Sequence, residues 1–292
     1  MEALNYDYAM ERRLKELDLD KHRRFTDAVF ALQHILSNYQ LIFPYFTDHT
    51  ELHSLTVIDF CNRLIGPQID RLNADEIYTL LMGSYFHDTG MGVSRRDYEQ
   101  FSAEIDFGDY FETHSRDDPP AIIRDFHNEY SGRFIRKYAE FFEIPSPAHL
   151  LAVVQVSRGH RKTDLTDESI YPTALAVPGG NTICLPYLAA LIRLADEIDV
   201  SAQRNSGLLY DVDGLTDPTG IKEYGKHRAV RELRITEDAF TLMVRTEDPR
   251  MLELLRLEAG KMQQTLDGCR RAVHGRTPYV ITQTRVKMEL LD

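Results

Sequence analysis

The 292-residue sequence is poor in cysteine and contains no Cys-x-x-Cys pair. Its three cysteines, Cys61, Cys184 and Cys269, are widely scattered, so neither a zinc ribbon nor a disulfide framework is expected. No uninterrupted apolar run approaches the roughly 20 residues of a membrane span. The N-terminal residues also lack the basic and then apolar regions of a secretion signal. These absences predict a protein of a reducing cytoplasm that has no membrane partner.

The sequence has no excess of positive charge: its formal net charge is -12. An acidic surface disfavours broad, nonspecific binding to nucleic acids or anionic membranes. A local basic pocket for one phosphate group remains compatible with this charge. The length is enough for one large domain or two modest ones.

Helical periodicity dominates the first 200 residues. In residues 1–40 an apolar stripe runs through Phe25, Val29, Leu32 and Leu36, at the spacing typical of a helix. Asn73, with Glu76 three residues later, resembles a capping box. Further helices are expected at 50–65, 73–88, 121–142, 147–157 and 185–199.

The pattern changes to alternation after about residue 215. Two short strands, 233–235 and 240–244, predict a hairpin; a helix over 249–273 and a strand over 279–288 follow. We therefore expect a mainly α protein in which residues 1–214 form a helical metal-binding domain. Residues 215–292 would form a small β-β-α-β extension, which serves homo-oligomer formation, acts as a lid or docks a protein partner.

Residues 92–120 are crowded with acidic side chains and close with Pro119-Pro120. One interpretation is an excursion, with short helices, over the mouth of a functional site. The alternative is a solvated acidic surface loop.

An adjacent His87 and Asp88 stand at the end of an apolar helix. Such a pair is costly to bury without a partner, and a divalent metal is a natural one because imidazole nitrogen and carboxylate oxygen both bind it. Other candidate ligands recur at intervals of roughly one helical hairpin; they are His53, His127, His160 and Asp196.

The order His53…His87-Asp88…Asp196 resembles the HD superfamily of metal-dependent phosphohydrolases. The flanking segments 43–54, 87–98 and 194–201 look like those of bacterial HD domains with a C-terminal extension, often called HD-CE. This resemblance covers roughly residues 20–290 and implies an HD-domain helical bundle.

The extended order, which includes His127 and His160, is similar to the binuclear branch of these proteins. That resemblance implies that Asp88 bridges two metals, with His53, His87 and Asp196 on the first and His127 and His160 on the second. Two cations about 3.5–4 Å apart can clamp a phosphoryl group and activate a water. The donors suit manganese, iron, nickel or zinc alike.

The implied activity is hydrolysis of a phosphoester or phosphoanhydride bond in a nucleotide, a short oligonucleotide or a related phosphodiester. HD-GYP phosphodiesterases carry a lysine three residues after the HD aspartate, where this sequence has Met91. No Gly-Tyr-Pro motif is present either, so cyclic-di-GMP hydrolysis is not expected. The pattern typical of deoxynucleoside triphosphohydrolases after the HD pair is also missing.

Several other polar residues are candidates for the site. His49 lies one helical turn before His53 and could act as an acid or contact substrate. Arg158, Arg161 and Lys162 bracket His160; they would either bind substrate phosphates or form a solvated surface turn. Two further arginines, Arg193 and Arg204, would bind phosphate or pair with Glu197 or Asp199. Asp199 is expected to support a ligand or the fold and not to bind metal itself.

Two other functions are compatible with the ligand order. Some HD proteins with this order hold a di-iron centre and are oxygenases, which consume oxygen. A regulatory module that senses nucleotides is the second alternative, although a site without catalytic function need not keep every ligand. Metal content and oxygen uptake would separate these functions.

Overall fold

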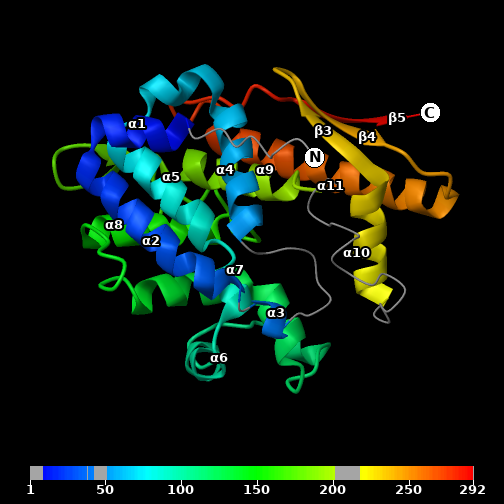
Figure 1. The fold of residues 1–292 in the computed structure, drawn as a ribbon, viewed down its shortest axis with the longest axis horizontal. Coiled ribbons are helices and arrows are strands. Elements are labelled where there is room, and N and C mark those ends of the chain that lie inside the picture. Colours follow the sequence, from blue (N-terminus) through cyan, green and yellow to red (C-terminus); the bar gives the residue numbers. More distant parts are fainter. Residues whose placement is uncertain (1–8, 38, 43–50, 201–217, 292) are drawn as a thin grey trace.

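The computed structural model describes residues 9–37, 39–42, 51–200 and 218–291, and most of them are helical (Figure 1). Helices α4, α5, α7, α8 and α9 pack against one another around a shared apolar core. The helices are α1 (Ala9–Leu17), α2 (Leu19–Ser37), α3 (Tyr39–Ile42), α4 (Glu51–Ile65), η1 (Gly66–Arg71), α5 (Ala74–Phe86), η2 (Thr89–Gly92), α6 (Arg95–Ser102), η3 (Tyr110–Glu112), α7 (Pro119–Lys137), α8 (Pro147–Arg158), α9 (Leu185–Glu197), α10 (Pro218–Ala229) and α11 (Pro249–Val273).

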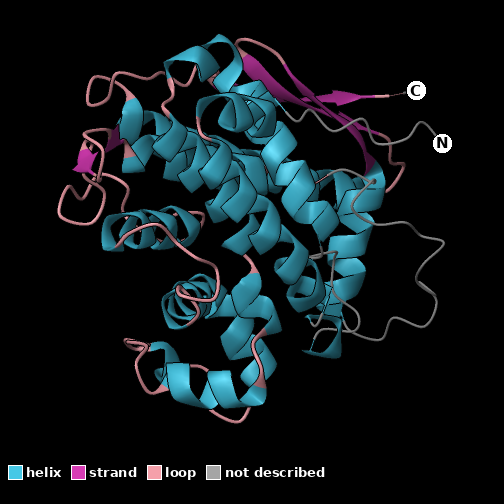
Figure 2. Ribbon diagram, turned by 60° about the vertical axis from the view of Figure 1, so that its left-hand side comes forward, coloured by secondary structure: helices cyan, strands magenta, loops and turns pink. Residues whose placement is uncertain are grey.

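Strands form two small sheets on opposite sides of the helical body (Figure 2). Strands β1 (Leu175–Ala176) and β2 (Thr182–Ile183) pair antiparallel. In the C-terminal sheet, β4 (Ala239–Val244) lies between β3 (Val230–Ile235), which is antiparallel to it, and β5 (Arg285–Leu290), which is parallel. The predicted fold class, mainly α with a small C-terminal α+β part, is confirmed.

Helix α5 runs through the centre of the bundle, and its residues from Asp75 to Phe86 are all buried. The predicted capping box is present: the Asn73 side chain accepts hydrogen bonds from the backbone N–H groups of Asp75 and Glu76. The Glu76 carboxylate in turn accepts from the Asn73 N–H. This cap fixes the start of the helix, so its other end delivers the His87-Asp88 pair to the interior.

The expected last strand begins six residues later than predicted. Tyr279 instead stacks on Tyr187, with ring centroids 4.3 Å apart, and its hydroxyl donates to the Glu76 carboxylate at 2.7 Å. The Gln68 side chain binds both the N–H and the carbonyl of Val280. These contacts with η1, α5 and α9 replace the ladder that alternation had predicted over residues 279–284. The structure also adds α10, which the sequence pattern did not predict, and ends α7 at Lys137 and α9 at Glu197.

The acidic segment 92–120 contains α6 and η3. All of its acidic side chains are exposed except that of Asp97. Asp97 forms an ion pair with Lys137 at 2.5 Å. This exposure favours the interpretation of the segment as a solvated surface.

The C-terminal extension meets the helical bundle through α11, which packs against α9 on one side and β5 on another (Figure 1). The predicted domain boundary at residues 214/215 lies outside the described residues and stays a prediction. None of the described helices combines the length and the apolar character that crossing a membrane requires.

Replacing Asn73 by alanine is expected to lower the free energy of unfolding by about 1–2 kcal/mol, because an N-cap is lost. The side chain also donates to the Thr182 carbonyl, so β2 loses an anchor. Urea denaturation measures the change. Lys15→Ala, at an exposed site of α1, is the control and should leave stability nearly unchanged; equal stability of both variants would contradict the capping role.

Candidate metal centre

The predicted ligands lie on several helices or in the turns that follow them, and they meet in the interior. His53 lies on α4, His127 on α7 and Asp196 in the last turn of α9. His87 caps the C-terminus of α5 and is followed by Asp88, and His160 lies just beyond α8. The histidines and Asp88 are at most 5% exposed, whereas the Asp196 side chain is 24% exposed.

The Asp88 carboxylate stands between two histidine pairs. Its Oδ2 is 3.4 Å from His53 Nε2 and 3.3 Å from His87 Nε2. Its Oδ1 is 3.4 Å from His127 Nε2 and 3.9 Å from His160 Nε2. Two groups of metal-ligating atoms therefore share Asp88, and each could hold a divalent ion.

Hydrogen bonds on the outer side of the cluster fix the tautomer of every imidazole. The Nδ1 atoms of His87, His127 and His160 lie 2.6, 2.7 and 2.6 Å from the carbonyl oxygen three residues earlier. A carbonyl oxygen only accepts, so each Nδ1 carries the proton and each Nε2 keeps a lone pair. His53 Nδ1 makes the equivalent bond to the Asp199 carboxylate at 2.7 Å. Metal-bound histidines are commonly oriented by outer partners of this kind.

The Nε2 lone pairs converge in pairs. His53 and His87 approach to 3.1 Å between their Nε2 atoms, and His127 and His160 to 2.8 Å. No proton is left to lie between them, so the contacts are repulsive unless a cation is shared. Two nitrogens bound about 2.1 Å from one ion at a right angle would be about 3.0 Å apart. The donor set therefore fits divalent metal ions.

The charges of the cluster also suit metal binding. Burial, reinforced by His87, lowers the pKa of His160 to about 4. Burial and Arg161 place the pKa of His127 well below its usual value. His127 and His160 are thus neutral ligands at neutral pH. Asp196 Oδ1 lies 3.2 Å from His53 Nε2, so both atoms can bind the same cation.

A break in α7 positions His127. Phe126 has non-helical angles (φ -122, ψ 15), and the Arg124 carbonyl at this break accepts the His127 Nδ1 proton. A methyl group on Gly90 would lie 2.1 Å from the His127 carbonyl oxygen. Only glycine lets the turn after Asp88 approach α7 so closely.

Ser131 is a supporting residue that the sequence interpretation missed. Its hydroxyl donates to the His87 carbonyl at 2.7 Å and accepts from the Gly90 N–H at 2.8 Å. Ser131 therefore ties the turn of the His-Asp pair to α7. Ser131 lies four residues after His127 and so on the same helix face, and this spacing could have identified it from the sequence.

Arg193 supports the second histidine pair. It donates to the Gly159 carbonyl at 2.7 Å and to the Thr163 carbonyl at 2.8 Å, so it holds the turn that carries His160. These bonds involve neither Glu197 nor Asp199, the two ion-pair partners considered from the sequence.

The remaining candidates are less closely tied to the cluster. Arg158 binds the Glu129 carboxylate through Nε and a terminal nitrogen, at 3.0 and 2.5 Å. Lys162 is exposed, with its Nζ 3.3 Å from the Asp125 carbonyl. His49 and Arg204 lie outside the described residues.

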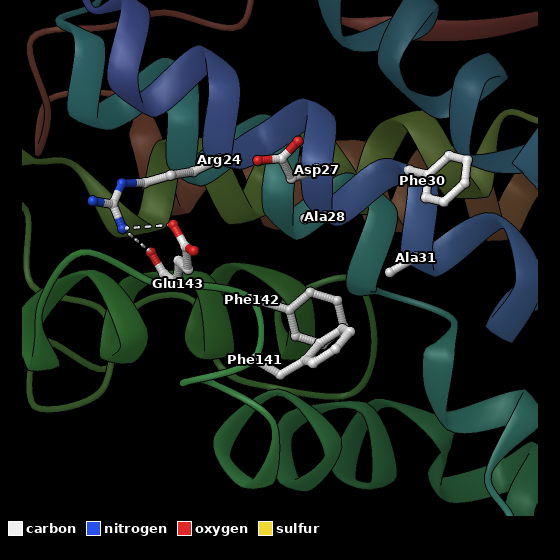
Figure 3. A pocket seen from close by; sticks show the side chains of 8 residues that line it. All are labelled: Arg24, Asp27, Ala28, Phe30, Ala31, Phe141, Phe142 and Glu143. Carbon is white, nitrogen blue, oxygen red and sulfur yellow. Dashed lines mark hydrogen bonds and ion pairs between the residues drawn. The ribbon is translucent and has the colours of Figure 1, made fainter.

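A separate groove of about 210 Å³ lies between α2 and the segment 141–143 (Figure 3). Phe30 and Phe141, about 70% exposed, flank it, and Arg24 and Glu143 pair at one end. None of the clustered histidines or aspartates lines this groove.

Asp199→Asn is expected to weaken metal binding by about 10–100-fold, as changes to residues that hydrogen-bond a metal-bound histidine typically do. The neutral asparagine amide accepts the His53 Nδ1 proton more weakly than the Asp199 carboxylate does, so the ring is held less firmly. Competition with a chelating dye measures the affinity. Asp117→Asn, an exposed change of the same charge, should leave affinity unaltered. Equal affinities of the Asp199 variant and wild type would contradict the role of this pair.

The stability of the metal-free protein should fall as the pH is lowered from about 6.5 towards about 4. In this range the unfolded chain protonates His160, whereas burial keeps the folded residue neutral because its pKa is lowered to about 4. Urea denaturation in EDTA at several pH values gives the slope. His160→Gln removes this proton difference and should flatten the slope; identical slopes would contradict the burial argument.

Comparison with known families agrees with the site. The family model HD-CE, an HD domain with a C-terminal extension, matches residues 43–274. No curated protein and no solved structure matches the chain. The matched region contains every clustered ligand, and together with the buried His/Asp cluster it indicates a metal-dependent hydrolase of the HD superfamily. The chain belongs to the HD-CE family.

Proposed function

We propose that this protein is a binuclear phosphohydrolase that cleaves a phosphoester or phosphoanhydride bond of a nucleotide or related phosphodiester. The attacking group is a water activated at the metal centre. The position of Asp88, with one carboxylate oxygen directed at each histidine pair, carries this proposal. A single-ion site would need only one of those oxygens.

In the proposed centre, Asp88 would bridge two ions. The first ion would also be held by His53, His87 and Asp196, and the second by His127 and His160. When bound, two divalent cations neutralise charge on the phosphoryl group and lower the pKa of a water between them. Manganese, iron, nickel and zinc all accept these nitrogen and oxygen donors.

The protein's own residues orient the imidazole rings and leave the Asp196 side of the cluster accessible. The outer hydrogen bonds hold each Nδ1 proton away from the reacting atoms, so only lone pairs face the centre. Asp196 is the most exposed ligand, and substrate approaches along its side of the cluster.

Water is favoured as nucleophile because the cysteines are unsuitable. All three are buried, and burial raises the pKa of Cys184 and Cys269 to about 12. A buried thiol of this kind is not ionised at neutral pH and is chemically inert.

A free nucleotide or short oligonucleotide suits the net charge of -12 better than a long polyanion does. Lys162 is exposed two residues after His160 and is our candidate for a phosphate contact. His49 remains a candidate acid. Arg158 would first have to leave Glu129, so it is the weaker phosphate ligand.

Asp88→Asn should lower kcat by about a thousandfold or more, because loss of the bridging carboxylate removes several kcal/mol of transition-state stabilisation. The assay follows hydrolysis of bis(p-nitrophenyl) phosphate and of a nucleotide set, with added Mn²⁺. The protein is purified anaerobically, its metal content is measured, and EDTA should abolish the activity.

Asp117→Asn is the matched control and should keep full activity. Full activity of Asp88→Asn would show that the site is wrongly assigned. Oxygen uptake coupled to turnover of a phosphonate or polyol would instead identify an oxygenase. A metal-loaded protein that binds nucleotides without hydrolysing any phosphate bond would point to a sensing module.

A further inference from the structure

A second cluster of charged side chains lies where α7 and α8 pack together. Arg158 of α8 extends across α7 at Gly132, where a Cβ atom would lie 2.7 Å from the arginine Cδ. It ends on Glu129, and its other terminal nitrogen donates to Gln155 at 3.0 Å. Arg133 reaches the same Glu129 carboxylate at 3.1 Å. Two guanidinium groups therefore share one carboxylate.

Arg136 adds a third guanidinium to this cluster. It lies four residues after Gly132 and three after Arg133, on the same face of α7. Within the part of the chain that the structure describes, it has no hydrogen-bond or ion-pair partner. Desolvation, followed by the positive charges of Arg158 and Arg133, lowers the pKa of Arg136. Glu129 is the carboxylate that counteracts them.

The cluster also holds unused donor capacity. Arg133 Nε is buried and makes no hydrogen bond to any described group; the nearest carboxylate, that of Glu104, is 3.8 Å away. The Glu104 side chain is 56% exposed, so its charge is strongly screened by water. An excess of positive charge and free N–H groups thus persists in a chain whose net charge is -12.

This cluster is separate from the metal centre. Residues two apart on an α-helix project about 200° from each other, so Glu129 and His127 face opposite sides of α7. His127 directs its Nε2 towards His160 and Asp88, whereas Glu129 faces the arginines. The cluster nevertheless lies on α7, which carries His127, and on α8, which ends just before His160.

We propose that Arg133, Arg136 and Arg158 form a binding site for the phosphate group of a small-molecule ligand, distinct from the metal centre. Planar guanidinium groups bind phosphate oxygens through paired, charge-assisted hydrogen bonds. The phosphate accepts hydrogen bonds from Arg136, which is exposed. Arg158 stays on Glu129 and Gln155 and, with Arg133, adds positive charge beside the phosphate. It is an ancillary ligand and not the substrate, so the site does not depend on the proposed hydrolysis.

Titration of the metal-free, full-length protein with inorganic phosphate tests this site, because EDTA removes any contribution from bound metal. Calorimetry at constant ionic strength, set with NaCl, should show saturable binding to wild type. Arg136→Gln should weaken that binding about tenfold or more, since charge-assisted hydrogen bonds are lost. Arg136→Lys keeps the charge but loses the planar fork and should bind with intermediate affinity.

Arg95→Gln is the matched control: it removes the same charge from a side chain that is 92% exposed and should bind phosphate as wild type does. Urea denaturation in chloride checks that each variant folds. The proposal is overturned if wild type shows no saturable binding, if both Arg136 variants bind like wild type, or if Arg95→Gln loses as much affinity as Arg136→Gln.

Discussion

Four buried imidazoles with their Nδ1 protons already donated outward impose the main constraint on this structure. Each has only a lone pair left for the interior, and the lone pairs meet in two pairs around Asp88. Such an arrangement is unfavourable by itself, because buried acceptors without donors lose the hydrogen bonds that water supplied. Divalent cations remove the conflict, so the chemistry that we propose follows from the same interaction that makes the cluster costly.

Contacts at the ends of the surrounding helices hold these imidazoles in position. The cap at Asn73 fixes the start of α5, and the break at Phe126 leaves the Arg124 carbonyl available to His127. Gly90 allows the turn after Asp88 to lie against α7. Ser131 and Arg193 then connect turns that lie far apart in sequence. Metal sites require such support because ligands must be held within a fraction of an ångström of their productive positions.

Much of this could be predicted from sequence, since local signals are strong where helices begin and end. The capping box and the helix at 249–273 depend on residues within a few turns of one another. The ligand set was predicted from the resemblance of its order to that of HD proteins. Other features depend on tertiary partners. Tyr279 lies outside the strand predicted for it and donates a hydrogen bond to Glu76, and Arg158 pairs with Glu129. Nothing near either residue in the sequence identifies those partners, because contacts between distant segments decide them.

The bridging position of Asp88 is the central claim, and its most direct test is anomalous diffraction from crystals of the manganese-loaded protein. The account predicts two anomalous peaks about 3.5–4 Å apart, one on each side of the Asp88 carboxylate. One peak would lie beside His53 and His87, and the other beside His127 and His160. A fully loaded crystal with a single peak, or with peaks that Asp88 does not join, would contradict it.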